Sequence, residues 1–83
     1  MIDKERIRLR RLELRLSQAD LGKALGQDQA YVSKIEHGLI TDITVRTLER
    51  LAYTLQVPIE TLLKPDELSE LHPTGLALAG QPV

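Results

Sequence analysis

The side chains best suited to chemistry in this 83-residue chain are amides, hydroxyls and one lysine in its first half. Gln18, Gln29, Ser33 and Lys34 all carry hydrogen-bond donors on side chains of moderate reach. A glutamine amide can pair with adenine through two hydrogen bonds, and a lysine can donate to guanine O6 and N7. The same groups can also donate to phosphate oxygens. These side chains are therefore able to reach base edges or phosphates.

Cys and His, which serve in many catalytic and metal sites, are scarce. The chain has no Cys, so we expect neither a disulfide nor a thiolate metal site. Its two histidines, His37 and His72, are far apart in the sequence and lack the spacing of metal ligands. The sequence also shows no acid–base pair at a plausible cleft and no phosphate-binding loop. We therefore expect no enzyme activity, no cofactor and no metal.

The net charge of −1 argues against assigning the chain to nucleic-acid binding from its charge alone, because nucleic-acid-binding domains are often strongly basic. The distribution of charge is more informative. Residues 1–64 hold all eleven basic residues and nine acids, whereas residues 65–83 hold three acids and no base. The sequence thus predicts a mildly basic domain over residues 1–64, followed by an acidic tail over residues 65–83.

The sequence has no targeting or membrane-spanning signal. No apolar run approaches the roughly 18 residues that a membrane span needs. The charged start, Met1 to Arg6, has no signal-peptide character. We expect a cytoplasmic protein that does not bind membranes.

Helical periodicity dominates the first 64 residues, and strand signals are nearly absent. The pattern predicts helices over about 3–14, 18–25, 29–37 and 45–55, and a short fifth helix from Pro58 to about Leu63. Gly26 and Gly38 are typical of positions just after a helix. Residues able to cap the first four helices precede them: Asp3, Ser17, Asp28 and Thr44. These elements predict an all-α orthogonal bundle.

Two residues do not fit the simple pattern of apolar inner faces. Arg11 falls on the apolar face of the first helix, between Ile7 and Leu14, and there needs a partner. Gly22 lies inside the second helix, where glycine costs about 1 kcal/mol relative to alanine. We expect another helix to approach closely at Gly22. In the fourth helix, Val45 is expected to begin a continuous apolar stripe that ends at Leu55.

The whole run of these elements resembles the lambda-repressor/Cro family of helix-turn-helix proteins. The resemblance rests on Leu16-Ser17-Gln18-Ala19-Asp20-Leu21-Gly22-Lys23-Ala24-Leu25-Gly26 and on Tyr31-Val32-Ser33-Lys34-Ile35-Glu36-His37-Gly38. It continues through residues 44–52 and 57–63, and covers about residues 5–63. It implies a five-helix, lambda-repressor-like DNA-binding domain, and a transcriptional regulator with repression as the expected mode. Such regulators usually bind palindromic operators in double-stranded DNA as homodimers.

The resemblance also implies roles for individual residues. The helix over 18–25 would cross the DNA backbone, with Gln18 holding a phosphate, and the helix over 29–37 would enter the major groove. It pairs Arg11 with Glu36, and it places Arg10 near the DNA backbone. Tyr31 has an alternative position, half-buried against the fourth helix. The residues expected to contact DNA are Gln18, Gln29, Ala30, Tyr31, Ser33, Lys34, Thr41 and Thr44.

The loop after the helix over 29–37 differs in sequence from that of many relatives. Residues 39–43 carry no positive charge, where relatives often have basic residues that contact phosphates. Fewer neutralised phosphates predict weaker non-specific binding and a shallower salt dependence.

The dimer surface has two candidates. One is the short fifth helix, through Ile59, Leu62 and Leu63, and the other is the tail, through Leu68 and Leu71. The apolar stretch 76–79 adds weight to the tail as a site for a second subunit or another protein. Two related functions stay open: a protein-interaction module such as an antitoxin, and the controller protein of a restriction–modification system.

Overall fold

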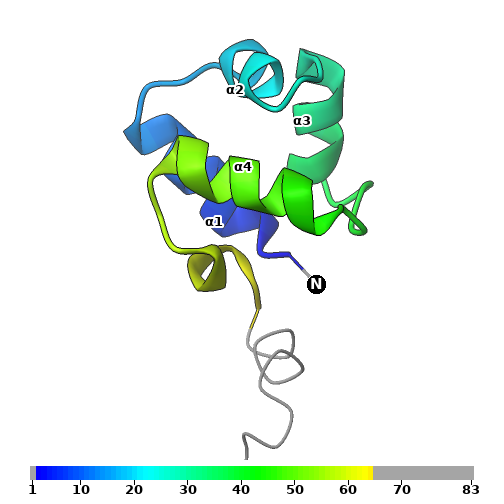
Figure 1. The fold of residues 1–83 in the computed structure, drawn as a ribbon. Coiled ribbons are helices and arrows are strands. Elements are labelled where there is room, and N and C mark those ends of the chain that lie inside the picture. Colours follow the sequence, from blue (N-terminus) through cyan, green and yellow to red (C-terminus); the bar gives the residue numbers. More distant parts are fainter. Residues whose placement is uncertain (1, 65–83) are drawn as a thin grey trace, which may run out of the picture.

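The computed structural model describes residues 2–64, which form a small helical domain. Its elements, in chain order, are α1 (Lys4–Glu13), α2 (Gln18–Ala24), α3 (Gln29–Glu36), α4 (Val45–Leu55) and the 3-10 helix η1 (Ile59–Leu62). In Figure 1, α2 and α3 lie together at one end, α1 and α4 cross below them, and η1 lies at the other end. The all-α class is confirmed. The fifth element differs from expectation, since it is a single 3-10 turn that begins after Pro58.

The four predicted capping residues all begin their helices. The Asp3 side chain accepts from the Arg6 N–H at 3.1 Å, and the Thr44 hydroxyl accepts from the Thr47 N–H at 3.1 Å. Asp28 caps α3 by accepting from the Tyr31 N–H at 3.0 Å. At α2 the cap is reciprocal, because the Asp20 N–H donates to the Ser17 hydroxyl while the Ser17 N–H donates to the Asp20 carboxylate. The α2–α3 pair therefore begins at well-defined points.

The helix ends are only partly those expected. Gly26 and Gly38 follow α2 and α3 with φ of +73° and +78°, as glycines after helices commonly do. By contrast, α1 and α4 are followed by Arg15 and Gln56, which adopt φ of +58° and +59°. Neither residue type marks a left-handed position in a sequence, so these two turns carried no signal.

The core lies between the four α-helices and η1. Its fully buried large side chains are Ile7, Leu21, Val32, Ile35, Leu51, Leu55 and Leu62. Leu62 was expected on a face available to a second subunit, and this expectation is wrong because the side chain is 0% exposed inside the monomer. Val45 was expected to face inward, yet it is 70% exposed because it is the first residue of α4 and lies at the edge of the fold.

The N-terminal residues complete the core by pairing with the end of η1. Ile2 and Leu63 form an isolated antiparallel bridge, and the Asp3 N–H donates to the Leu62 carbonyl oxygen at 2.8 Å. Ile2 is buried as a result. This contact joins the two ends of the described domain, and no local sequence pattern indicated it.

Two further expectations concern the tail and membranes. Leu68 and Leu71, the tail candidates for dimerisation, lie outside the described residues. Within residues 2–64, each helix is too short or too polar to span a lipid bilayer.

Candidate nucleic-acid interface

The α2–turn–α3 geometry depends on the missing side chain of Gly22. A Cβ atom at Gly22 would overlap the backbone carbonyl oxygen of Asp28 and lie 2.5 Å from its carbonyl carbon. In addition, the Gln27 N–H donates to the Gly22 carbonyl oxygen at 2.8 Å. The close approach expected at Gly22 is therefore real, and it is made by the backbone that begins α3. It fixes how α3 is presented relative to α2.

A buried ion pair holds α3 against α1. Arg11 Nε donates to Glu36 Oε2 at 2.7 Å, and Arg11 Nη2 donates to Glu36 Oε1 at 3.1 Å. Both residues are less than 10% exposed. A third donor, Arg11 Nη1, reaches the Leu16 carbonyl oxygen at 2.8 Å, so the guanidinium also fixes the segment between α1 and α2. The arginine on the apolar face of the first helix is thus paired with Glu36, as the family resemblance implies.

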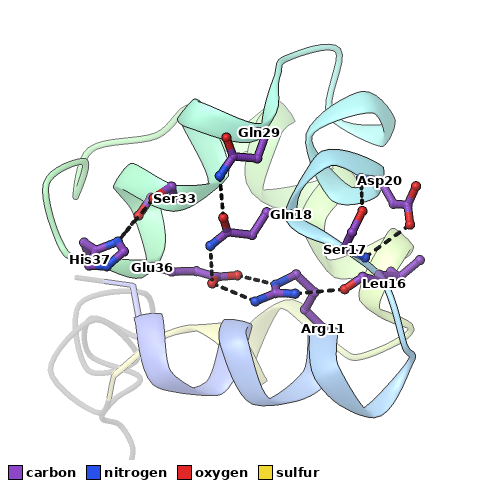
Figure 2. A network of polar contacts seen from close by, with 9 residues as sticks. All are labelled: Arg11, Leu16, Ser17, Gln18, Asp20, Gln29, Ser33, Glu36 and His37. Atoms are coloured by element: carbon purple, nitrogen blue, oxygen red, sulfur yellow. Dashed lines mark hydrogen bonds and ion pairs between the residues drawn. The ribbon is translucent and has the colours of Figure 1, made fainter.

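A chain of amides extends from this ion pair to the exposed start of α3 (Figure 2). Gln18 Nε2 donates to Glu36 Oε1 at 3.0 Å, and Gln29 Nε2 donates to Gln18 Oε1 at 2.6 Å. An ionised carboxylate can only accept, so Gln18 must present its nitrogen to Glu36 and its oxygen to Gln29. Gln29 must in turn present its nitrogen to Gln18, which directs its carbonyl oxygen away from the network (Figure 2).

This orientation matches the requirements for reading adenine. The Gln29 amide nitrogen keeps a second N–H, and its oxygen can accept, which is the donor–acceptor pair complementary to adenine N7 and N6. Gln29 is exposed, whereas Gln18 behind it is half-buried. A buried Glu36 needs hydrogen-bond donors, which is a signal that the sequence contains. The spacing of Gln18 and Gln29 along the chain did not show that their amides would contact each other.

The other residues expected to contact DNA differ in how exposed their side chains are. Ala30, Lys34 and Thr41 are exposed, while Tyr31 is half-buried and packs against the hydrophobic core. This position fits the packed alternative for Tyr31, and its contact with DNA stays a prediction.

Two candidate hydroxyls already take part in helix ends. The Ser33 hydroxyl lies 3.3 Å from His37 Nδ1, and the same ring nitrogen lies 2.7 Å from the Ser33 carbonyl oxygen (Figure 2). The Thr44 hydroxyl caps α4 and donates to the Thr47 hydroxyl at 3.0 Å. Either hydroxyl would have to share its hydrogen bonds with a phosphate or a base.

Arg10 has a structural contact that sequence reasoning missed. Its Nε donates to the Leu55 carbonyl oxygen at 2.8 Å, and its Nη1 pairs with Glu13 at 3.0 Å. A cation at the last carbonyls of α4 is favoured by the helix dipole. The resemblance placed Arg10 near the DNA backbone, whereas the structure gives it the role of a C-terminal cap on α4.

Among residues 2–64, His, Asp and Glu side chains nowhere gather in a group of three that could hold a metal ion.

Comparison with known proteins agrees with this geometry. A helix-turn-helix family model matches residues 7–62. The P22 c2 repressor, solved with a synthetic operator, is 38% identical with a TM-score of 0.68, and the match covers 74% of this chain and 91% of the repressor. SinR, a master regulator of biofilm formation solved in complex with DNA, is 33% identical with a TM-score of 0.68, over 74% of this chain and 100% of SinR.

An enzyme also shares the fold. Hydroxypropylphosphonic acid epoxidase from S. wedmorenis is 29% identical with a TM-score of 0.70, over 75% of this chain. This chain spans only 32% of the length of the epoxidase, and the match is confined to the helix-turn-helix-like part of that enzyme. Comparison with curated protein sequences gave no significant match. The family model and the repressor match cover most of the described domain, and the chain therefore belongs to the Cro/C1-type family of helix-turn-helix proteins.

Proposed function

We propose that this protein is a transcriptional regulator that binds a specific site in double-stranded DNA as a homodimer, with repression as its mode of action. The observation that carries the proposal is the relay Arg11–Glu36–Gln18–Gln29, which holds one amide in a defined orientation at the exposed start of α3. Preorganised polar groups of this kind lower the entropy cost of recognition. The P22 c2 repressor and SinR, both solved with DNA, support it by similarity.

In this proposal α3 enters the major groove with its N-terminal half foremost. Gln29 reads adenine, Lys34 reads guanine or contacts a phosphate, and Ala30 and Ser33 lie against the neighbouring bases. Gln18, on α2, holds Gln29 in place and can contact a phosphate. Tyr31 supports α3 from its half-buried position. Base specificity would then come from α3, and the position on the DNA from α2.

The loop between α3 and α4 provides the second backbone contact. Thr41 and Thr44 are exposed and can donate to phosphates through their hydroxyls or through neighbouring N–H groups. The nearby Asp42 is also exposed and opposes this contact by its charge. The protein therefore binds DNA with few charge contacts and depends on the fit of α3.

A homodimer places two copies of α3 about 34 Å apart on a palindromic site. Ile59 and Leu63 are half-buried in the monomer and remain candidates for the dimer contact. Leu62 is excluded as a dimer contact because its side chain is fully buried in the core of the monomer.

The test is selection of preferred duplexes from a random pool, followed by titration of the winner and of a scrambled duplex at one fixed salt concentration. We expect a palindrome with half-sites one helical turn apart, bound at least ~10³-fold more tightly than scrambled DNA. Failure to enrich any sequence, with weak binding that disappears in moderate salt, would overturn the proposal. The antitoxin-like function, in which the fold binds a protein, would then take its place.

A further inference from the structure

A small cavity lies beside the C-terminal end of α3. Its volume is about 200 Å³. Three isoleucines, Ile2, Ile35 and Ile40, provide its apolar lining, and two lysines, Lys4 and Lys64, contribute the charge. For scale, an apolar cavity of about 150 Å³ holds a benzene molecule. The space is therefore sufficient for one leucine-sized side chain, with two cations to attract carboxylates nearby.

The cavity also borders the loop that we place against DNA. Gly38 and Thr41 line it together with Ile40, so its wall is the start of the α3–α4 connection. The Lys4 ammonium lies near Gly38, where a Cβ atom would be 3.0 Å from Nζ. An occupant of this cavity would contact the loop from the side of α1.

The path of the chain brings a suitable occupant to this cavity. The Ile2–Leu63 bridge fixes the end of the described domain beside the N-terminus, so that Lys64 itself lines the cavity. The residues that follow are Pro65-Asp66-Glu67-Leu68-Ser69-Glu70-Leu71. They combine acids, complementary to the two lysines, with leucines, complementary to the isoleucines.

The connection is long enough for this contact. An extended chain spans at most about 3.3–3.6 Å per residue, which allows Leu68 roughly 14 Å and Leu71 roughly 25 Å of reach from Lys64. Because the segment belongs to the same chain, its effective concentration at the cavity is high, of the order of millimolar for a short flexible link. Weak individual contacts then suffice.

We propose that residues 66–71 dock into this cavity of their own chain, with a leucine on the isoleucine lining and carboxylates beside Lys4 and Lys64. The docked segment buttresses the α3–α4 loop and so links the tail to the surface that carries Thr41. This role differs from tail-mediated dimerisation, because the contact forms within one subunit. It does not depend on DNA binding.

The test uses the full chain, which has no Cys, so that Ser69→Cys provides a single site for a nitroxide spin label. Paramagnetic broadening is measured by NMR on the methyl groups of Ile2, Ile35 and Ile40. Because residue 69 is only five residues from Lys64, the label broadens nearby signals even when the segment is not docked. We therefore expect these methyl signals to broaden more than in the same labelled chain carrying Leu68→Asn and Leu71→Asn, while the Ala24 methyl signal on α2 stays sharp. Diluting the spin-labelled, isotope-labelled protein with unlabelled wild type must leave the broadening unchanged. Equal broadening at the isoleucines in these two labelled proteins would overturn the proposal.

A mixed sample separates docking within one chain from docking between chains. Isotope-labelled wild type is mixed with spin-labelled Ser69→Cys that carries no isotope label. Broadened isoleucine signals in this mixture would show that the segment docks on a second copy, and would also overturn the proposal. We expect sharp signals.

Matched variants test the chemistry of the contact. In the spin-labelled background, Leu68→Asn with Leu71→Asn should reduce the broadening to that of an undocked segment, while Leu76→Asn with Leu78→Asn should leave it unchanged. Lys4→Glu should weaken docking by roughly 1.4- to 5-fold, the range for one exposed ion pair, whereas Lys23→Glu on α2 should not change it. Equal effects of the two leucine pairs would contradict the assignment of residues 66–71.

Discussion

At the scale of single residues, the carboxylate of Glu36 orders the polar groups around it. It accepts hydrogen bonds from Arg11 and from Gln18, and the Gln18 amide then accepts from Gln29. The relay begins at a buried charge and ends at an exposed amide. A change at its buried end should therefore affect folding, and a change at its exposed end should affect recognition.

The buried end is tested by Arg11→Ala. The substitution strands the Glu36 carboxylate, which is 8% exposed, and it removes the donor to the Leu16 carbonyl oxygen. Breaking one partner of a buried pair costs about 3–5 kcal/mol, so the free energy of unfolding should fall by that amount. Urea denaturation followed by circular dichroism measures it. Arg8→Ala, at an exposed position of the same helix, is the control and should be nearly neutral. An unchanged free energy of unfolding in Arg11→Ala would rule out a stabilising role for the pair.

The exposed end is tested by Gln29→Ala. Loss of a two-bond contact to one base costs about 1–3 kcal/mol, or roughly 5- to 150-fold in affinity for each half-site of the selected duplex, and the homodimer loses the contact in both half-sites. Specificity should relax at that base pair in each half-site, because the remaining contacts are unchanged. Fluorescence anisotropy on duplexes substituted at each position measures both effects. The exposed Gln27, in the turn before α3, provides the matched control Gln27→Ala. A uniform loss over all sequences would show that Gln29 contacts phosphate instead.

At the scale of elements, the approach of α2 to the start of α3 is the tightest constraint. Gly22→Ala improves helix propensity by about 1 kcal/mol, yet its Cβ would collide with the Asp28 backbone. Since backbone atoms cannot rotate away, overpacking of about 1–3 kcal/mol should prevail, and the variant should be less stable than the wild type. Chemical denaturation measures the difference, with Lys23→Ala at the exposed neighbouring position as the control. A more stable Gly22→Ala would show that the turn can move.

The reciprocal cap of α2 gives a pH dependence. The pKa of the Asp20 carboxyl lies below its ordinary value of 3.8, chiefly because the Ser17 N–H donates to the carboxylate, with the Ser17 hydroxyl and Lys23 adding to the effect. A lowered pKa in the folded state contributes stability that is present above the unfolded pKa and is lost as the pH falls through the folded value. An NMR titration of the Asp20 carboxyl carbon should therefore give a midpoint below 3.8.

The same cap predicts the behaviour of a variant. Asp20→Asn should lose this part of the acid dependence of stability, while Glu60→Gln on the exposed surface of η1 should keep it. Identical acid profiles of the wild type and Asp20→Asn would contradict the assignment of the cap.

The elements also show which features a sequence can predict. Capping residues and the glycines after α2 and α3 act through local backbone chemistry, so Ser17, Asp28 and Gly38 were readable from their neighbours alone. The left-handed turns at Arg15 and Gln56 are imposed by packing, because neither residue type prefers that conformation. The burial of Leu62 likewise depends on a long-range pairing with the N-terminus, which no local pattern contains. The Gln18–Gln29 contact arises in the same way, from two helices that meet.

At the scale of the whole molecule, charge is the least typical property of this protein as a DNA binder. Residues 1–64 carry a small positive net charge, and the acids of residues 65–83 make the net charge of the whole chain negative. The α3–α4 loop adds no cation, and its only charged side chain is the acidic Asp42. Affinity in this protein should then come from shape and hydrogen bonding more than from the release of counterions. That balance predicts a weak dependence of binding on salt.

Asp42→Lys tests this balance directly. A lysine at this exposed loop position should neutralise one phosphate in each half-site, and the slope of log K against log[salt] for the homodimer should steepen by about 1.8. Affinity should rise for specific and scrambled duplexes alike, since a phosphate contact carries no sequence information. Glu60→Lys makes the same change in net charge on η1, which Figure 1 shows at the end of the domain opposite α2 and α3. It should leave the slope nearly unchanged. Equal steepening by both variants would mean that net charge alone governs binding, and a steep slope in the wild type would contradict the predicted weak salt dependence.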